Sequence, residues 1–197
     1  MSFLLTAPAD AEPIPERIFS ENIDPALLHL KNANRIDEIR CEMGISYRQE
    51  IFITNPIART MRRDWNIVSA KMYVFGLDAQ YKGQIKDDLD ELHDQVEALL
   101  KIVSIDTFSD VDTSWLMQLP LQIKVISPLS WSWLGALKTW DICTARLLTA
   151  ERLGFIDRKQ RMKMLHPVSV AYLGFKSRAM KSNTKSSSEM VEVGYLM

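Results

Sequence analysis

The chain has 197 residues, 47% apolar and 25% charged, a balance typical of a globular protein rather than a disordered one. No apolar run approaches the roughly 18 residues of a membrane span, and the N-terminus lacks the positive segment of a signal peptide. The net charge of −1 conceals two unlike halves, because residues 116–185 carry +9 and residues 1–115 carry −8. Such a split suggests a polyanionic partner for the basic half, or simply a solvated basic surface.

The first third of the chain predicts an irregular start followed by short elements. Residues 1–20, rich in Pro, Ala and Glu, predict an arm, and residues 25–43 predict a helix that Gly44 ends. Residues 45–53 fit either a strand or a short helix, and periodicity does not decide between them. Asn55-Pro56 then predicts a break. An arginine-rich turn is expected before Trp65, with Arg59, Arg62 and Arg63.

Residues 67–103 predict one long helix. Its apolar residues recur at steps of four and three, and its other face is charged. We expect the stripe to pack within the same chain, with a partner chain as the alternative, and we expect His93 on the solvated side. The stripe consists of Tyr81, Ile85, Leu89, Leu92, Val96, Leu99 and Val103.

A polar connector over residues 107–113 marks the main boundary, and a strand follows it. Residues 121–127, between Pro120 and Pro128, alternate between apolar and polar and predict a half-polar β-strand. A single strand is not stable alone, so it needs a sheet or a copy of itself from a second chain.

Two helices are predicted after the strand. Ser127 is a good N-cap for a helix from Pro128 to Leu153, and Gly154 is its stop. Asp157 can cap a second helix from Arg158 to about Leu165, where Pro167 predicts a break. The tryptophans of the first helix fall at helical spacing with leucines, which favours a place in the core for Trp131, Trp133 and Trp140.

No pattern of catalytic or metal-binding residues is present in the sequence. The histidines are scattered, Cys41 and Cys143 lack metal-like spacing, and phosphate-binding glycine loops and hydrolase or zinc-protease motifs are missing. We therefore expect no enzyme activity, no catalytic residue, no metal site and no cofactor. The two cysteines fit buried thiols of a cytosolic protein.

The two faces of the strand predict a contact with DNA. In a two-fold antiparallel ribbon, Ile123 and Val125 would face the helices, whereas Gln122, Lys124 and Ile126 would face outward. Gln can pair with adenine and Lys with guanine, each good pair contributing about 1–3 kcal/mol of discrimination. The start of the second helix would bind phosphate through its amides and nearby cations. The alternative is an edge strand on which Lys124 blocks aggregation. The expected phosphate-binding residues are Arg158, Lys159, Arg161 and Lys163.

Residues 119–165 resemble a family found on integrating conjugative elements and related plasmids, which includes the AcaB-type activators of conjugative transfer genes. The resemblance lies in the alternating strand ending in Ser-Pro, the long helix with Asp141 near its middle, Thr149-Ala150, and the turn from Gly154 to Asp157. These activators are similar to ribbon-helix-helix transcription factors. The resemblance implies a dimeric DNA-binding regulator with Gln122 and Lys124 at the reading positions.

The expected fold is mainly α with a single short strand completed by dimerisation, a ribbon-helix-helix-like dimer with a large helical N-terminal extension. The expected regions are an arm (1–20), the extension (21–113), the DNA-binding region (114–180) and a flexible tail (181–197). The expected function is sequence-specific regulation of conjugative transfer genes, as an activator in preference to a repressor, by a dimeric β-ribbon that reads the major groove. The expected location is the bacterial cytoplasm, near the nucleoid or plasmid. Expected partners are double-stranded DNA, a second copy of the chain, and a co-regulator or RNA polymerase bound by the extension, with no membrane. The alternative is a component of the conjugation apparatus that does not bind promoters.

Overall fold

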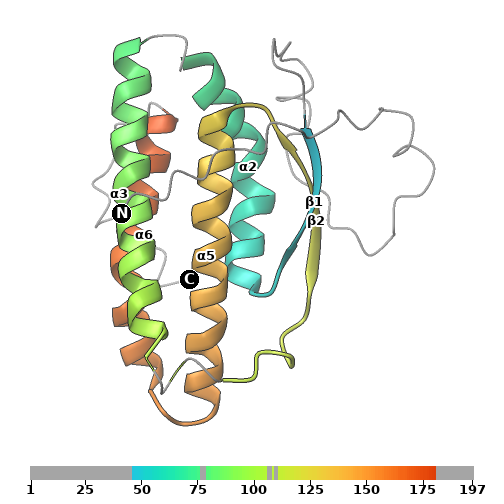
Figure 1. Cartoon of the computed structure of the whole chain (residues 1–197), viewed down its shortest axis with the longest axis vertical. Coiled ribbons are helices and arrows are strands. Elements are labelled where there is room, and N and C mark those ends of the chain that lie inside the picture. The colour runs from blue at the N-terminus through green and yellow to red at the C-terminus, as the bar shows by residue number, and fades with distance from the viewer. Residues whose placement is uncertain (1–45, 76–78, 106–107, 109–110, 181–197) are drawn as a thin grey trace, which may run out of the picture.

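The computed structural model describes residues 46–75, 79–105, 108 and 111–180, and these form four helices and one two-stranded antiparallel sheet (Figure 1). The expected arm, the helix over residues 25–43 and the tail lie outside the described residues. In chain order the elements are β1 (Ser46–Phe52), α2 (Asn55–Phe75), α3 (Ala79–Val103), β2 (Leu119–Val125), α5 (Pro128–Arg152) and α6 (Arg158–Ala179).

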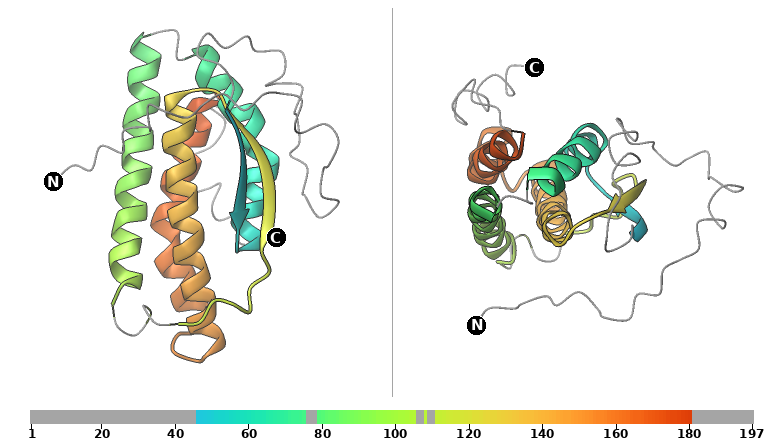
Figure 2. Two further views of the ribbon diagram at one scale, coloured as in Figure 1. Left: turned by 45° about the vertical axis from the view of Figure 1, so that its right-hand side comes forward. Right: turned by 90° about the horizontal axis from the view of Figure 1, so that it is seen from above.

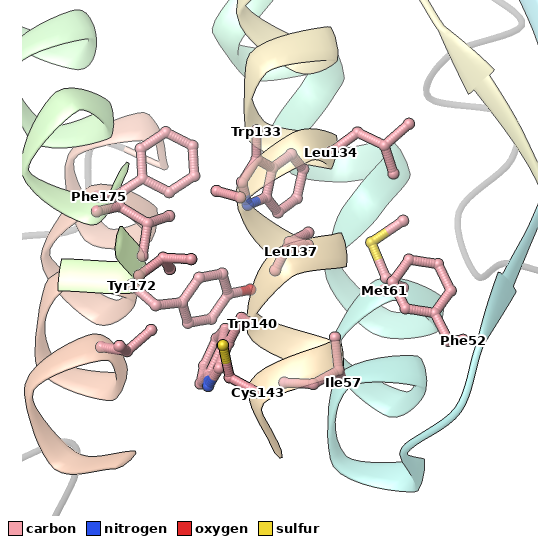
Figure 3. Packing of buried hydrophobic residues seen from close by; sticks show 14 of the residues in the cluster. Phe52, Ile57, Met61, Trp133, Leu134, Leu137, Trp140, Cys143, Tyr172 and Phe175 are labelled. Atoms are coloured by element: carbon pink, nitrogen blue, oxygen red, sulfur yellow. The ribbon is translucent and has the colours of Figure 1, made fainter. Parts of the chain in front are cut away.

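The elements form three layers, seen from above in Figure 2. Helices α3 and α6 pack together in one outer layer, α2 and α5 form the middle layer, and the sheet covers α2 on the other side. Helix α5 is therefore buried on both flanks. In Figure 3, Phe52 and Met61 lie on one side of it, and Tyr172 and Phe175 of α6 lie on the other.

The predicted strand is present as β2, but its partner lies in the same chain, so the expectation of a single strand completed by a second copy is wrong. β1 pairs with β2 in an antiparallel register that sets Ser46 opposite Val125 and Phe52 opposite Leu119. The ambiguous residues 45–53 are thus mostly strand. We call this two-stranded sheet the ribbon. Its inner face buries Leu121 and Ile123 completely, and the indole of Trp65 in α2 donates to the main-chain oxygen of Lys124 over 2.9 Å.

The helices of the N-terminal half differ from the predicted ones. Asn55-Pro56 begins helix α2 rather than breaking the chain, because proline is tolerated in the first turn, where its missing N–H costs no hydrogen bond. Arg59, Arg62 and Arg63 are helical residues of α2, not a turn. The helix expected over residues 67–103 is two helices, since α2 ends at Phe75 and α3 begins at Ala79.

Helix α5 matches its predicted bounds, whereas α6 is longer than predicted. Ser127 and Asp157 cap the two helices, each in a capping box with the residue three positions later. Helix α6 continues through Pro167 to Ala179. A proline inside a helix costs about 3 kcal/mol, and the buried stripe of α6 outweighs this cost by packing against α3. That stripe contains Leu165, Val168, Tyr172, Phe175 and Ala179.

A single hydrophobic core runs through both halves of the chain. Trp65 of α2 stacks on Trp133 of α5 with ring centroids 4.9 Å apart, so the core crosses the expected boundary after residue 113. Trp133 and Trp140 are buried, as predicted. The apolar stripe of α3 packs within the chain, as also predicted, and His93 is half-buried instead of solvated, bonded to Ser132 of α5 over 2.8 Å.

Two buried carboxylates join elements across this core. Asp141 of α5 accepts hydrogen bonds from the backbone N–H groups of Ile53 and Thr54 and from the Thr54 hydroxyl. Burial raises the pKa of Asp141 by more than these hydrogen bonds lower it. Asp64 of α2 accepts from the Tyr172 hydroxyl over 2.7 Å and pairs with Lys176 over 2.9 Å, both in α6.

Candidate nucleic-acid interface

The outer face of the ribbon presents two glutamine side chains opposite each other. Gln49 of β1 pairs with Gln122 of β2 in the register, and Ile51 pairs with Pro120 on the same face. Because strand side chains alternate, Lys124 lies on this face as well. Gln49 is exposed, and Gln122 and Lys124 are partly exposed. The face therefore offers two amides and one ammonium group to a ligand.

The inner face holds the ribbon firmly against α5. The guanidinium of Arg48 lies 4.2 Å from the ring centroid of Trp131, and Glu50 pairs with Lys138 over 2.6 Å. Phe52 is fully buried at the end of β1. These contacts fix the backbone of β1 and so determine where the side chains of the outer face point.

Ile126 does not belong to the outer face. It is only 3% exposed and forms part of the core, so the prediction that it reads bases is wrong. The alternation on which that prediction relied stops at Val125, where β2 ends. After Val125 the chain leaves the strand and reaches Ser127, the N-cap of α5. The side chain of Ile126 is therefore directed into the core.

Part of the basic character of the C-terminal half is neutralised by the acidic half of the same chain. Lys138, Lys176 and Arg178 pair with Glu50, Asp64 and Asp88, respectively. The asymmetry of charge along the sequence is thus partly a complementarity between packed elements. It is a weaker indication of a polyanionic partner than the sequence alone suggests.

The predicted phosphate-binding residues lie at the start of α6 but are not equivalent. Arg158, Lys159 and Lys163 are exposed, and none of them contacts an acidic group among the described residues. Arg161 differs, because it is paired with Glu151 near the end of α5. One of the N-terminal amides of α6 that were expected to bind phosphate already has a partner, because the carboxylate of Asp157 accepts from the N–H of Gln160 over 2.7 Å.

The ribbon runs beside the N-terminal half of α5, where Glu50 pairs with Lys138, whereas the start of α6 lies beyond the C-terminal end of that helix (Figure 1). Lys124 precedes the N-terminus of α5 by a few residues, whereas Arg158 follows its C-terminus. The 25 residues of α5 span about 37 Å at 1.5 Å per residue. The structure therefore brings Gln122 and Lys124 together with Gln49, and it does not bring them to the cations of α6. Phosphate binding by those cations stays a prediction.

The sequence did not identify Gln49 as a site residue, although residues 46–52 alternate as the strand β1 does. Residues 46–52 read Ser-Tyr-Arg-Gln-Glu-Ile-Phe, a mixed pattern in which the inward positions include Arg48 and Glu50. Charged residues on the inner face hid the alternation that would otherwise have predicted a strand.

The described residues contain neither a cluster of metal-binding side chains nor a helix that could cross a membrane. No family model and no curated protein matches the chain. Among solved structures, the crystal structure of selenomethionine-containing AcaB from uropathogenic E. coli is similar, with a TM-score of 0.52 and 15% sequence identity. The match covers 78% of this chain and 88% of that chain. This similarity supports an AcaB-like fold.

Proposed function

We propose that the protein is a sequence-specific DNA-binding regulator of conjugative transfer genes that reads the major groove with the outer face of its ribbon. The observation that carries the proposal is the pairing of Gln49 with Gln122 beside Lys124 on an anchored two-stranded sheet. The major groove admits a two-stranded ribbon, and these side chains can bind its base edges. The AcaB-like fold and the family resemblance of residues 119–165 point in the same direction.

The ribbon of one chain suffices for one half-site, because both strands come from that chain. We propose that two copies bind a palindromic site, each placing its ribbon in one major groove, so that the spacing of half-sites reflects the symmetry of the dimer. A co-regulator or RNA polymerase would then bind elsewhere on the protein, which we place in the bacterial cytoplasm. No enzymatic step and no cofactor is needed for this function.

The proposal is tested by selecting bound sites from a pool of random double-stranded DNA with the full chain. We expect enrichment of one palindromic motif, and we expect affinity for it to fall steeply as salt rises. Lys124→Ala and Gln122→Ala should each lower discrimination between the selected site and a scrambled one by about 1–3 kcal/mol. Gln49→Ala should lower discrimination by a similar amount. If only β2 contacted the bases, Gln49→Ala would have no effect.

The matched control is Lys82→Ala, which removes the same charge from α3 in the layer farthest from the ribbon. It should leave discrimination unchanged. If no motif is enriched, or if the Lys124 and Gln49 variants discriminate as well as the unaltered chain, the ribbon is not the reader. A genome-wide map of bound sites then tests whether those sites are promoters of transfer genes.

A further inference from the structure

The turn between α5 and α6 carries large apolar side chains that are exposed to solvent. Leu153 and Phe155 are each 55% exposed, and Trp115, in the loop between α3 and β2, is 44% exposed. Trp115 belongs to the same end of the molecule, because its indole N–H donates to the Thr149 hydroxyl of α5 over 3.0 Å. We call this region the α5–α6 tip. It comprises Trp115, Arg152, Leu153, Phe155, Arg158 and Lys159.

The backbone of the tip is rigid. Helix α5 ends in a Schellman motif, with Gly154 at a φ of +80°, the Gly154 N–H donating to Glu151 and the Phe155 N–H donating to Ala150. The capping box of Asp157 begins α6 immediately afterwards, and the ion pair of Arg161 with Glu151 joins the two helices. The backbone that carries Leu153 and Phe155 is thus held by hydrogen bonds on both sides of the turn.

The tip contains a tryptophan and two arginines, residue types that are enriched where protein interfaces gain most of their binding energy. Such residues form interaction hot spots when large apolar side chains around them exclude water. The guanidinium of Arg152 lies 4.3 Å from the ring centroid of Trp115, which orients it. Arg158 and Lys159 add exposed cations that contact no acidic group among the described residues. A partner that fits this surface must supply both apolar side chains and carboxylates.

DNA fits the tip less well than a protein does. Phosphates gain nothing from Leu153 and Phe155, and the exposed carboxylate of Asp157 occupies the helix N-terminus where a phosphate would otherwise bind. An acidic segment with large apolar residues fits both features, since it can bury the apolar side chains and place its carboxylates on the surrounding cations.

We propose that the α5–α6 tip is a docking surface for an acidic, apolar segment of a partner protein, separate from the ribbon. The ribbon lies beside the N-terminal half of α5, where Glu50 pairs with Lys138, and the tip lies at the C-terminal end of the same helix. A regulator built in this way can hold DNA at one end and a second protein at the other. The inference does not depend on DNA binding by the ribbon.

The test uses the full chain to select from a displayed library of random peptides. We expect enriched peptides to carry Asp or Glu beside large apolar residues. Phe155→Ala should weaken binding of a selected peptide about tenfold or more, as expected for a hot spot. The double change Arg158→Ala, Lys159→Ala should weaken it about three- to tenfold and reduce its dependence on salt.

The matched controls are Ile142→Ala, which removes an exposed apolar side chain from the middle of α5, and Lys82→Ala on α3. Neither should change peptide binding, and near-UV circular dichroism should show that every variant is folded. Enriched peptides without acidic residues, or binding unaffected by Phe155→Ala, would overturn the proposal. It would also be overturned if no peptide binds while the Arg158, Lys159 double variant loses affinity for nonspecific duplex DNA, because the tip would then contact phosphate.

Discussion

At the scale of single residues, Asp141 joins α5 to the segment that connects β1 with α2. Its carboxylate lies in the middle of α5 and accepts hydrogen bonds from two backbone N–H groups at the junction of β1 and α2. The N-terminal amides of a helix have no partners within the helix, so a buried helix start needs an acceptor from elsewhere. Asp141 provides it, and in doing so it sets the position of the ribbon relative to α5.

Asp141→Ala should lower the free energy of unfolding by about 2–4 kcal/mol, because it leaves buried donors of Ile53 and Thr54 without an acceptor. Asp141→Asn keeps one acceptor oxygen and should cost less. Urea unfolding at neutral pH measures both changes. Glu97→Ala, which removes an exposed carboxylate from α3, is the control and should leave stability almost unchanged. Equal stability of the Asp141→Ala variant and the unaltered chain would contradict this role.

At the scale of elements, Asp64 ties α2 to α6 and makes this contact sensitive to acid. Burial alone would raise the pKa of Asp64, but hydrogen bonds from Arg63, Lys176 and Tyr172 together outweigh it and lower the pKa below its usual value of 3.8. A carboxylate whose pKa is lowered by folding stabilises the folded state above its unfolded pKa. This contribution is lost as the pH falls through the folded pKa.

We therefore expect the stability of the unaltered chain to fall as the pH drops below about 4. Asp64→Asn should be less stable at neutral pH and should lose less stability over the same acid range. Urea unfolding at a series of pH values between neutral and strongly acid measures this difference. Asp90→Asn, on the exposed face of α3, should show the acid dependence of the unaltered chain. Parallel pH profiles for Asp64→Asn and the unaltered chain would exclude Asp64 as a source of the acid sensitivity.

The sequence predicted those features of the fold that depend only on neighbouring residues, such as helix caps, helix ends and apolar stripes. The caps Ser127 and Asp157, the stop at Gly154 and the stripe of α3 follow from neighbouring residues, and the structure contains each of them. The continuation of α6 through Pro167 depends on packing against α3, which no local pattern contains.

The candidate site was predicted only in part, because half of it depends on pairing between distant residues. Alternation in β2 placed Gln122 and Lys124 on one face, and their exposure agrees with this. Gln49 comes from a strand more than sixty residues away in the sequence, and only the register places it opposite Gln122. Ile126 was assigned by continuing an alternation beyond the end of its strand.

At the scale of the whole molecule, the two expected regions share one hydrophobic core. Trp65 stacks on Trp133, Asp141 caps the start of α2, and α3 packs against both α5 and α6. An N-terminal extension that folded separately would need a core of its own, whereas here the buried residues form one cluster. The residues before 113 thus help to form the base on which the ribbon rests.

A single core predicts a single unfolding transition for the full chain. Helix content followed by far-UV circular dichroism and tryptophan fluorescence, to which the buried Trp65 and Trp133 contribute from the two halves, should give the same midpoint in urea. Leu92→Ala opens a cavity in α3, where Leu92 is fully buried, and should cost about 2–5 kcal/mol. Because α3 shares its core with α5 and α6, both signals should shift to lower urea by the same amount. If Leu92→Ala instead separates an early loss of helix from a later change in fluorescence, the chain folds as two units divided near residue 113.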